Sequence, residues 1–412
     1  MERVVITGMG VISPIGNDVD TFWQALSSGQ SGISAIDVFD TARFKTKFAG
    51  IVRDFDADAL FGRKDARRMD RFAKFAVAAA EQAVQDAGLD MESVDRERVA
   101  VYVGSGIGGI DTLIDQQTIL SQRGPQRISP LLVPVMIANS AAATISIRLG
   151  SWGPTLCPVT ACSIGNTAIG EALRLIRSGD ADVVIAGGAE AAINEVALAG
   201  FSNATALSER NDNPAGASRP FDAERDGFVM AEGAGIVVLE SLRHAQARQA
   251  HIYAEVIGYG ASSDAYHMVA THPEGRGAVQ AMRQALKNAG ITPDEVDVIS
   301  AHATSTSVGD ISETKAIKEL FGERAYTIPV TANKSITGHM LGAAGGAEAI
   351  ALVQTLRHGL IPPTINLEHR DEACDLDYVP NTARHADVKI GLSNSFGFGG
   401  HNAVIVLKAY EQ

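Results

Sequence analysis

The amino-acid sequence predicts an α/β fold with largely parallel or mixed sheets. Short apolar runs alternate with helical segments along the whole chain, which is the pattern of such folds. Many of the 41 glycines fall in short clusters after these runs, as tight loops and close helix packing require. A chain of 412 residues with 46% hydrophobic content can bury a large core, so we expect two domains or two fused halves.

Apolar runs rich in β-branched residues predict the strands. In chain order these are Arg3–Gly8, Val99–Val103, Thr155–Thr160, Asp182–Gly187, Gly235–Leu239, Ile252–Gly258, Val296–Ala301, Ile328–Thr331, Ile390–Ser393 and Ala403–Leu407. Apolar residues at helical spacing predict helices over Val19–Leu26, Arg71–Ala87, Asn166–Arg177, Ala278–Ala289, Glu313–Phe321 and Leu341–Arg357. The polar, turn-rich stretch from Asn211 to Phe228 is predicted to be a long ordered loop.

The two halves of the chain resemble each other weakly. The run Val99–Gly104 and its glycine-rich turn resemble Val296–Ala301 and the polar turn that follows. The turn around Cys162 and its helix have a counterpart in Gly338-His339 and the helix after them. A duplicated βα unit would explain both pairs, although the pattern alone leaves duplication open.

Charge and cysteine usage exclude several classes of protein. The net charge of −13 argues against general binding to nucleic acid or membrane surfaces. We see no signal peptide and no apolar stretch long enough to cross a bilayer. Cys157, Cys162 and Cys374 form no CxxC pair, which predicts a reduced, cytoplasmic protein. The histidines lack metal-binding spacing, so no metal site is expected.

Cys162 lies among small residues in Val-Thr-Ala-Cys-Ser-Ile-Gly (159–165), between a predicted strand and a predicted helix. Unpaired backbone N–H groups and the positive end of the helix at such a turn favour a thiolate. A thiolate there is a nucleophile, and the same N–H groups can stabilise an oxyanion. The competing interpretation is a buried structural cysteine, because free cysteine is among the most buried residue types.

His302 follows a predicted buried strand in His-Ala-Thr-Ser-Thr (302–306). The C-terminal edge of a strand is where α/β folds place ligands, although a capped core histidine is equally compatible with the pattern. Thr304 and Thr306 can be either turn formers or ligand contacts.

His339 and Lys334 come from Asn-Lys-Ser-Ile-Thr-Gly-His (333–339), just before a helix of small residues. A histidine at a helix N-terminus tends to stay neutral because the dipole lowers its pKa. Lys334 precedes Glu348 by 14 residues, so the two can pair only if Lys334 reaches back from before the helix. A surface lysine is the alternative.

Two glycine-rich stretches add to these motifs. Gly104-Ser-Gly-Ile-Gly-Gly109 fits GxGxxG, but no strand ending in an acidic residue follows about 20 residues later, as dinucleotide binding needs. We interpret it as a close-packed loop that lines a pocket with Ile107. Asn394–Asn402 (NSFGFGGHN) sets two phenylalanines among glycines, which suits a loop that approaches a ligand and carries a swinging ring. An aromatic-plugged turn is the alternative.

The combination of cysteine, histidines, lysine and Gly/Phe loop at successive strand ends resembles the β-ketoacyl-acyl carrier protein synthases. Nearly the whole chain fits, and it looks most like the synthase II type of bacterial fatty-acid synthesis. The matching blocks are VTACSIG (159–165), SRPFDAERDGFVMAEGAG (218–235), HATSTSVGD (302–310), NKSITGH (333–339), PPTINLE (362–368) and NSFGFGGHN (394–402).

The resemblance implies a thiolase-like five-layer αβαβα fold from two duplicated βα halves, usually as a homodimer. Residues 1–250 would carry the nucleophilic cysteine, and residues 251–412 the two histidines and the Gly/Phe gate loop. The Cys–His–His set differs from the synthase III branch, which has asparagine in place of one histidine. It also differs from thiolases, which use a second cysteine; the acidic surroundings of Cys374 oppose that role.

The resemblance also assigns catalytic roles. Cys162 would accept the acyl chain as a thioester, with the N–H groups of Cys162 and Phe398 as oxyanion hole. His302 and His339 would promote decarboxylation of malonyl-acyl carrier protein and hold the enolate, which attacks the thioester to give 3-oxoacyl-acyl carrier protein and CO2. Lys334, Glu313 and Glu348 would be supporting charges. Thr304 and Thr306 would bind the pantetheine arm, and Ile107 and Gly399 would contact the substrate. Phe398 would act as a gate.

The implied partner is acyl carrier protein, which brings its own phosphopantetheine, so no tightly bound cofactor is expected. The carrier is acidic, and an enzyme with net charge −13 then needs a local basic face. The predicted docking residues are Lys64, Arg67, Arg68, Arg71, Arg123 and Arg127. A solvated helix face is the alternative interpretation of these charges.

Two features depart from the family pattern. His401 stands where some relatives carry threonine, and Val269-Ala270 replaces polar residues expected beside the malonyl site. They leave the handling of the extender unit open, as the sequence also leaves chain-length and unsaturation preference.

Three other functions remain to be separated from this one. A condensing subunit of a type II polyketide synthase shares the fold and catalytic set. A cysteine hydrolase using Cys162 and His302 would release free acid. A binding or scaffolding protein with the same fold would not be labelled at Cys162 by a fatty-acyl donor.

Overall fold

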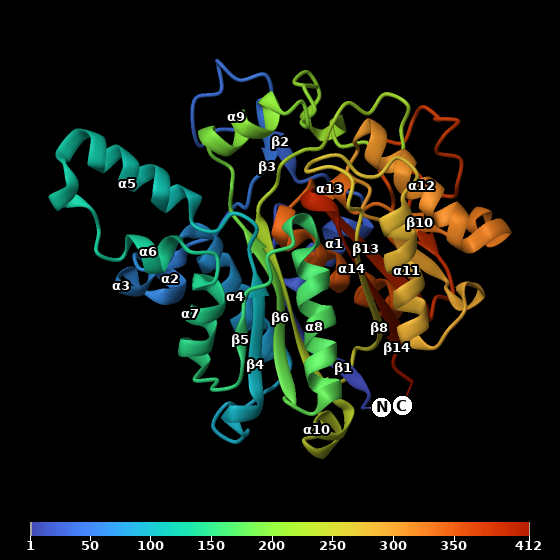
Figure 1. Ribbon diagram of the computed structural model, residues 1–412, viewed down its shortest axis with the longest axis horizontal. Helices are drawn as coiled ribbons and strands as arrows, with labels where there is room; N and C mark the ends of the chain where they lie inside the picture. Colours follow the sequence, from blue (N-terminus) through green and yellow to red (C-terminus); the bar gives the residue numbers. More distant parts are fainter. Residues whose placement is uncertain (1, 412) are drawn as a thin grey trace.

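One ten-stranded mixed sheet runs through the computed structural model, which describes residues 2–411 (Figure 1). One end of the sheet consists of β1 (Val4–Ile12), β7 (Gly233–Ser241), β6 (Val183–Glu190), β4 (Val99–Gly104) and β5 (Thr155–Leu156), in that order. The other end consists of β8 (Ala254–Ser263), β14 (His401–Ala409), β13 (Ile390–Gly397), β9 (Val298–Ser300) and β10 (Val330–Thr331). Antiparallel pairing of Val5 with Glu255 joins the two ends at β1 and β8.

The two sets of five strands share one topology. In the first set β7 is antiparallel to both neighbours, and β6, β4 and β5 are parallel to one another. In the second set β14 is antiparallel to both neighbours, and β13, β9 and β10 are parallel. The same strand order and directions therefore occur twice, which confirms the duplication that the sequence left open.

Helices and strands form five layers. The middle helices α8 (Ile164–Ser178) and α14 (Ala344–His358) lie in a core that joins both strand sets, in which Ile169 and Ile350 pack with Val184 and Ile405. A second core packs α4 (Arg71–Asp86) and α7 (Ser140–Leu149) on the outer face of the first set. A third packs α11 (Arg276–Ala289) and α12 (Ser307–Phe321) on the second set. The predicted αβαβα architecture is therefore present.

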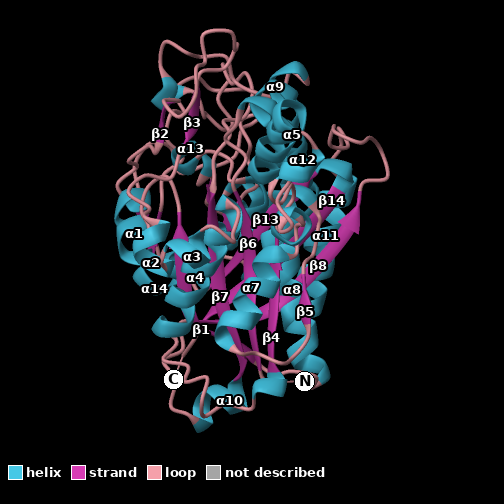
Figure 2. Cartoon of the chain, turned by 90° about the vertical axis from the view of Figure 1, so that its left-hand side faces the viewer, coloured by secondary structure: helices cyan, strands magenta, loops and turns pink. Residues whose placement is uncertain are grey.

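The remaining elements surround these layers. The shorter or peripheral helices are α1 (Val19–Ser27), α2 (Ala57–Phe61), α3 (Arg63–Ala66), α5 (Ile110–Arg123), α6 (Leu132–Met136), α9 (Glu195–Asn203), α10 (Leu242–Ala247) and α13 (Lys334–Thr337). Two small sheets pair β2 (Ile33–Ala35) with β3 (Phe48–Gly50), and β11 (Leu360–Ile361) with β12 (Arg384–His385). Figure 2 shows long loops gathered at the end of the molecule opposite the chain termini.

The two middle helices begin in the same way. A 3₁₀ turn precedes each one, Ala161–Ser163 before α8 and Leu341–Ala343 before α14. Each turn starts at a non-glycine residue with positive φ, 50° at Ala161 and 49° at Leu341. The helices meet at their N-terminal ends, where a Cβ on Gly165 would lie 2.2 Å from the backbone nitrogen of Gly346. Only glycine permits this approach, so the motif around Cys162 is fixed by helix packing as well as by chemistry.

The structure corrects three sequence predictions. The buried strand predicted over Thr155–Thr160 is wrong: only Thr155 and Leu156 form a strand, and both are exposed at the sheet edge. The helix predicted from Glu313 begins earlier, because the Thr306 side chain accepts a hydrogen bond from Gly309 N and caps α12. The stretch predicted as a loop at Asn394–Asn402 is mostly a hairpin of β13 and β14, with Gly397 paired to His401.

Candidate active site

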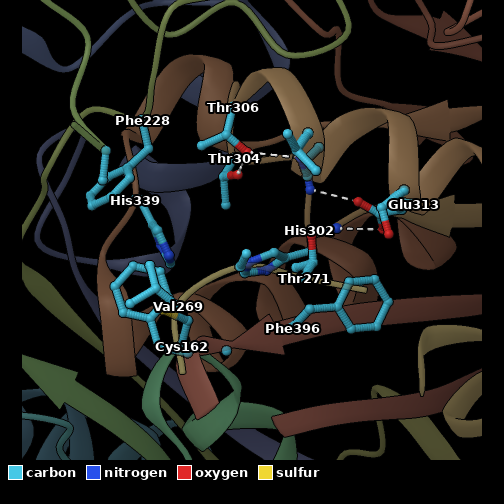
Figure 3. Close-up of a pocket in the computed structure, with 18 of the residues that line it drawn as sticks. Cys162, Phe228, Val269, Thr271, His302, Thr304, Thr306, Glu313, His339 and Phe396 are labelled. Atoms are coloured by element: carbon cyan, nitrogen blue, oxygen red, sulfur yellow. Dashed lines mark hydrogen bonds between the residues drawn. The ribbon is translucent and has the colours of Figure 1, made fainter. Parts of the chain in front are cut away.

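A cavity of about 330 Å³ is lined by Cys162, His302 and His339, which the sequence predicted to converge (Figure 3). Phe398 also lines it, whereas Lys334 is not part of the lining. Cys162 comes from the turn before α8, His302 follows β9, and His339 follows β10 and α13. The duplicated topology brings these strand ends to the same place, as parallel α/β sheets do. The cavity is lined mainly by apolar side chains, including Phe201, Phe228, Val269, Leu341, Phe396 and Phe398.

The side chain of Cys162 is a protonated thiol, because it is desolvated. Burial raises its pKa to about 11, while Lys334 and the backbone N–H groups of Phe398 and Cys162 oppose the rise. The backbone N–H groups of the turn favour the thiolate, as predicted, but desolvation outweighs them. The side chain is nevertheless half-buried rather than sealed, and it faces the cavity.

The turn of the β13–β14 hairpin brings a second backbone donor to Cys162. The turn spans Phe398–Gly400, and the preceding Gly397 approaches the nucleophile so closely that its Cβ would lie 2.9 Å from Cys162 N. The N–H of Phe398 therefore reaches the sulfur together with the N–H of Cys162 itself. Two N–H groups that converge on one corner can hold a negatively charged oxygen.

His302 is fixed on both sides. Its backbone N–H and that of Ala303 donate to the Glu313 carboxylate at 2.9 and 2.8 Å. Its Nδ1 lies 3.5 Å from Lys334 Nζ, which can only donate when charged. Burial, with Lys334 and His339 adding to it, lowers the pKa of His302 well below its usual value, so the ring is neutral and carries its proton on Nε2.

His339 is also neutral with its proton on Nε2, but a different hydrogen bond fixes this tautomer. Its Nδ1 accepts a hydrogen bond from Leu341 N at 3.3 Å, which again leaves the proton on Nε2. Burial and Lys334 lower the pKa of His339 well below its usual value, as the sequence predicted from the helix end alone. The two imidazoles are perpendicular, with ring centroids 5.4 Å apart, and Phe228 packs edge-on against His339. The cavity therefore contains two neutral N–H donors.

Lys334 reaches back to Glu348 and forms a buried ion pair with it, as the spacing required. Lys334 is 1% exposed, so the surface-lysine alternative is wrong. Burial raises the pKa of Glu348 to about 7, and the ammonium group opposes that rise. The pair places a positive charge behind His302, where it keeps that imidazole neutral.

The predicted substrate contacts divide into two groups. Thr304 and Thr306 line the cavity, with their hydroxyl oxygens 3.0 Å apart, and Thr306 also caps α12. Ile107 and Gly399 lie outside the cavity lining; Gly399 N instead donates to Met268 O at 2.7 Å.

Of the two departures from the family pattern, one lies in the cavity and the other lies outside it. Val269 and Ala270 line the cavity beside Thr271, so they can contact a ligand. His401 is an exposed residue at the start of β14 and is not part of the cavity lining.

Five of the six predicted docking residues are exposed: Lys64, Arg67, Arg68, Arg123 and Arg127. They belong to α3, α5 and the segments that follow these helices, which lie on the same side of the molecule (Figures 1 and 2). Arg71 differs, because its guanidinium donates to Glu232 at 2.9 and 2.7 Å and packs over Phe75. It holds α4 in place, so it is removed from the docking set.

Sequence reasoning missed three residues that shape the site. Phe228 ends the long loop and packs on His339, and Asn394 donates to Glu313 at 3.0 Å. Glu190 is buried at the end of β6 and accepts hydrogen bonds from both halves of the chain. Each was hidden because nothing local in the sequence shows which distant backbone a buried polar group will meet.

Residues 2–411 contain neither a candidate metal site nor a candidate membrane-spanning helix. No group of three or more His, Cys, Asp or Glu side chains there has an arrangement that could hold a metal ion. None of the helices in this range is long and apolar enough to span a membrane.

Comparisons with known proteins agree with the geometry. Residues 1–245 match the model of the beta-ketoacyl synthase N-terminal domain, and residues 253–368 match that of the C-terminal domain. The chain is 51% identical to 3-oxoacyl-[acyl-carrier-protein] synthase 2 of Synechocystis sp. over 410 residues, covering 100% of this chain and 99% of the relative. It is 50% identical to the Staphylococcus aureus protein of the same name, with the same coverage.

Solved structures show the same fold. The ishigamide ketosynthase/chain length factor superposes with a TM-score of 0.93 at 39% identity, covering 100% of both chains. A type II polyketide ketosynthase in complex with its acyl-carrier protein, AntDE:AntF, superposes with a TM-score of 0.92 at 37% identity, again over 100% of both chains. With family models that match most of its length and relatives at half identity, this chain belongs to the beta-ketoacyl synthase family.

Proposed function

We infer that the protein condenses a cysteine-bound acyl chain with malonyl-acyl carrier protein, giving 3-oxoacyl-acyl carrier protein and CO2. This is the chain-lengthening step of fatty-acid synthesis, and the protein is an acyltransferase. The observation that carries the inference is one cysteine and two neutral imidazole donors in a single apolar cavity. The name 3-oxoacyl-[acyl-carrier-protein] synthase 2 of the relatives supports the same reaction.

In the first half-reaction, Cys162 Sγ bonds to the acyl carbonyl carbon while the bond from that carbon to the pantetheine sulfur breaks. The thiol proton ends on the departing pantetheine thiol, so protons balance without an external acid. The N–H groups of Cys162 and Phe398 stabilise the oxyanion of the tetrahedral intermediate. The raised pKa of Cys162 leaves little thiolate at neutral pH, but that thiolate is a strong nucleophile.

In the second half-reaction, the malonyl carboxylate leaves as CO2, and the electron pair of its C–C bond moves onto the thioester oxygen. The Nε2–H groups of His302 and His339 donate to this enolate oxygen, which neutral donors can do without supplying a proton. The α-carbon then attacks the acyl carbon on Cys162. The cysteine sulfur leaves and takes one proton from solvent.

The remaining residues act around these steps. Lys334 holds Nδ1 of His302, and Glu313 holds the backbone that carries it. Thr304 and Thr306 donate to the pantetheine arm, and Phe398 moves aside to admit malonyl once Cys162 is acylated. Phosphopantetheine arrives on the carrier, so the reaction needs no resident cofactor or metal.

Acyl carrier protein docks on the exposed cations of α3 and of the α5 region. An ordinary carrier carries excess negative charge, and a local cluster of cations can attract it despite the overall net charge of −13. The complex of a related ketosynthase with its acyl-carrier protein supports a carrier as partner. The reaction takes place in the cytoplasm, with no membrane or nucleic acid involved.

The enzyme acts as a homodimer. Among the described residues, α5 has no buried side chain, and β5 pairs only with β4, so a sheet edge and a helix are left without partners. Exposed apolar residues also lie on α7 and on the loop that joins α7 to β5, with Ile147 at 80% and Trp152 at 68% exposure. A second copy of the chain, related by a twofold axis, would cover both.

A polyketide condensing subunit remains the second candidate, because a similar solved structure is a type II polyketide ketosynthase in complex with its acyl-carrier protein. The two functions differ in the number of condensations. A fatty-acid enzyme extends the chain once and waits for reduction, whereas a polyketide enzyme extends an unreduced chain repeatedly.

The function is tested by incubating the protein with acyl-carrier proteins of graded chain length and excess malonyl-carrier protein, with products identified by mass spectrometry. We expect one 3-oxoacyl product, two carbons longer than each donor, and an acyl adduct on Cys162. Release of free acid alone would identify a hydrolase, and repeated extension would identify a polyketide enzyme. Absence of an adduct would identify a binding protein.

The same assay tests the docking surface. Replacing Lys64→Glu together with Arg68→Glu is expected to raise KM for carrier-linked substrates at low salt, because the variant repels the carrier. Alkylation of Cys162 by a small reagent serves as the control and should not change. A KM equal to that of the wild type would remove α3 from the docking surface.

A further inference from the structure

Glu190 is a buried carboxylate for which the reaction scheme above has no role. It ends β6 and is 1% exposed. Four donors converge on it: Ser105 Oγ at 2.7 Å, Gly106 N at 2.9 Å, Ile107 N at 3.1 Å and Gly342 N at 3.2 Å. The first three belong to the N-terminal half and the last belongs to the C-terminal half, so one side chain joins the two.

The surroundings of Glu190 suit the ionised form. Three of its four partners are backbone N–H groups, which can only donate. Burial raises the pKa of Glu190, and all four hydrogen bonds oppose the rise because they favour the charged carboxylate. Glycines make the arrangement possible: a Cβ on Gly106 or Gly342 would lie 2.9 or 2.8 Å from Oε2.

On one side, Glu190 holds the turn that fixes His339. Gly342 directly follows Leu341, whose N–H donates to His339 Nδ1 at 3.3 Å. Leu341 has a φ of 49°, a strained conformation that needs external support. The bond from Gly342 N to Glu190 supplies that support. Loss of it would free the turn and, with it, the ring orientation and tautomer of His339.

On the other side, Glu190 holds the glycine-rich loop after β4. Its Oε1 accepts from Ser105 and Ile107, and Ser105 Oγ in turn accepts from Gly108 N at 3.0 Å. This loop packs beside the start of α8, where a Cβ on Gly104 would meet Ile164 at 2.5 Å. Glu190 also acts on Cys162 through space, because its negative charge disfavours the thiolate and raises the pKa of Cys162.

We propose that Glu190 is a positioning residue for the condensation, which orients His339 through Gly342 and holds the loop of Ile107 beside the start of α8, the helix that follows Cys162. The hydrogen bonds of Glu190 link the two halves of the chain close to the cavity to which both halves contribute reactive residues. The assignment rests on the proposed function, since it concerns the same histidine and cysteine.

Two substitutions separate the two sides. In Glu190→Gln the amide nitrogen must face Ser105, the only partner that can also accept, so the bond from Ile107 is lost while Gly106 and Gly342 keep their oxygen. In Glu190→Ala all four bonds are lost. We therefore expect malonyl-carrier decarboxylation to fall roughly 10- to 100-fold in Glu190→Ala and clearly less in Glu190→Gln.

The rate of Cys162 alkylation provides a readout that a purely structural role would not move. Both variants remove the negative charge, so alkylation by iodoacetamide at pH 8 should become about threefold faster or more, even where condensation is slower. Glu240→Gln is the matched control: Glu240 is equally buried in the same sheet but pairs with Thr7, His244 and Arg248. It should lower the melting temperature without changing the alkylation profile.

The possible outcomes are distinct. If the wild-type protein condenses and Glu190→Ala decarboxylates malonyl-carrier protein at the wild-type rate, the positioning role is refuted. If Glu190→Ala does not fold, Glu190→Gln decides: the role is refuted if both decarboxylation of malonyl-carrier protein and alkylation of Cys162 equal those of the wild type. A wild-type protein that does not condense would refute the proposed function instead, and the alkylation experiment would still report on Glu190.

Discussion

Cys162 shows how burial and hydrogen bonding compete at a single residue. The motif VTACSIG predicted a nucleophile, and the structure places that cysteine in the cavity with both histidines. The protonation state could not be predicted, because desolvation by residues from distant segments outweighs the local N–H groups and Lys334. A thiol that stays protonated in the resting enzyme is protected from oxidation and from unselective alkylation.

The raised pKa of Cys162 leads to a direct prediction. Its alkylation rate by iodoacetamide should rise about tenfold per pH unit between pH 7 and pH 9, whereas the rate of a free cysteine, with a pKa of about 8.5, begins to level off within this range. Above pH 9 the rate should continue to rise, because the pKa of Cys162 is about 11. Peptide mass spectrometry on samples quenched at each pH measures the rate at this residue alone. A plateau below pH 8 would show that the thiolate is stabilised, as the sequence had suggested.

At the scale of elements, the crossing of α8 and α14 depends on glycine. Gly165→Ala places a methyl group 2.2 Å from Gly346 N, so the helices must separate. We expect a loss of about 2 kcal/mol or more in the free energy of unfolding. The matched control is Gly200→Ala in α9, where no described atom lies within 4 Å of the new Cβ. It should raise stability by about 0.4–1 kcal/mol.

Both free energies can be measured by urea unfolding followed by circular dichroism. Equal effects of the two substitutions would show that α8 and α14 are not in close contact. A destabilised Gly165→Ala that keeps its denaturant m-value would indicate a local packing change.

Elements with strong periodicity could be predicted, and those decided by distant partners could not. The strands β1, β4, β6 and β7 are rich in apolar residues and fully buried. Helix α5 was missed because its apolar side chains are not part of the monomer core. The buried strand predicted through Val159 failed for a related reason, since Val159 is 54% exposed. Exposed and buried segments can carry the same local pattern of apolar residues.

The candidate site was likewise predicted in part. The motifs identified Cys162, His302, His339 and Lys334, because each combines a reactive group with a turn at a strand end. The tautomers of the histidines and the partners of Glu313 could not be predicted, because they depend on contacts such as Asn394 with Glu313, 81 residues apart. Sequence motifs indicate which groups react, whereas the fold decides their protonation.

At the scale of the whole molecule, the exposed apolar segments α5–α7 and β5 lead to a prediction about assembly. Ile147→Lys puts a charge at a position that is 80% exposed in the isolated chain, so folding should be unaffected while dimer formation is weakened. Sedimentation equilibrium of wild type and variant at equal concentration measures the mass. Tyr326→Lys, at an exposed position in the 3₁₀ turn that follows α12, serves as the control.

We expect the wild type and Tyr326→Lys to have the mass of a dimer and Ile147→Lys to shift toward the monomer. A monomeric wild type would contradict the homodimer. If all three proteins remained dimeric, the interface would lie elsewhere than on α7.

The meeting of α8 and α14 also has an electrostatic consequence. Two helices of 15 residues direct their N-termini to one point, so two positive dipole ends overlap beside the cavity. In the proposed reaction the negative charge moves from carboxylate to enolate, then to alkoxide and finally to thiolate. Because the fold is duplicated, every one of these anions forms within the same permanent field, and the protein need not reorganise as the charge passes between them.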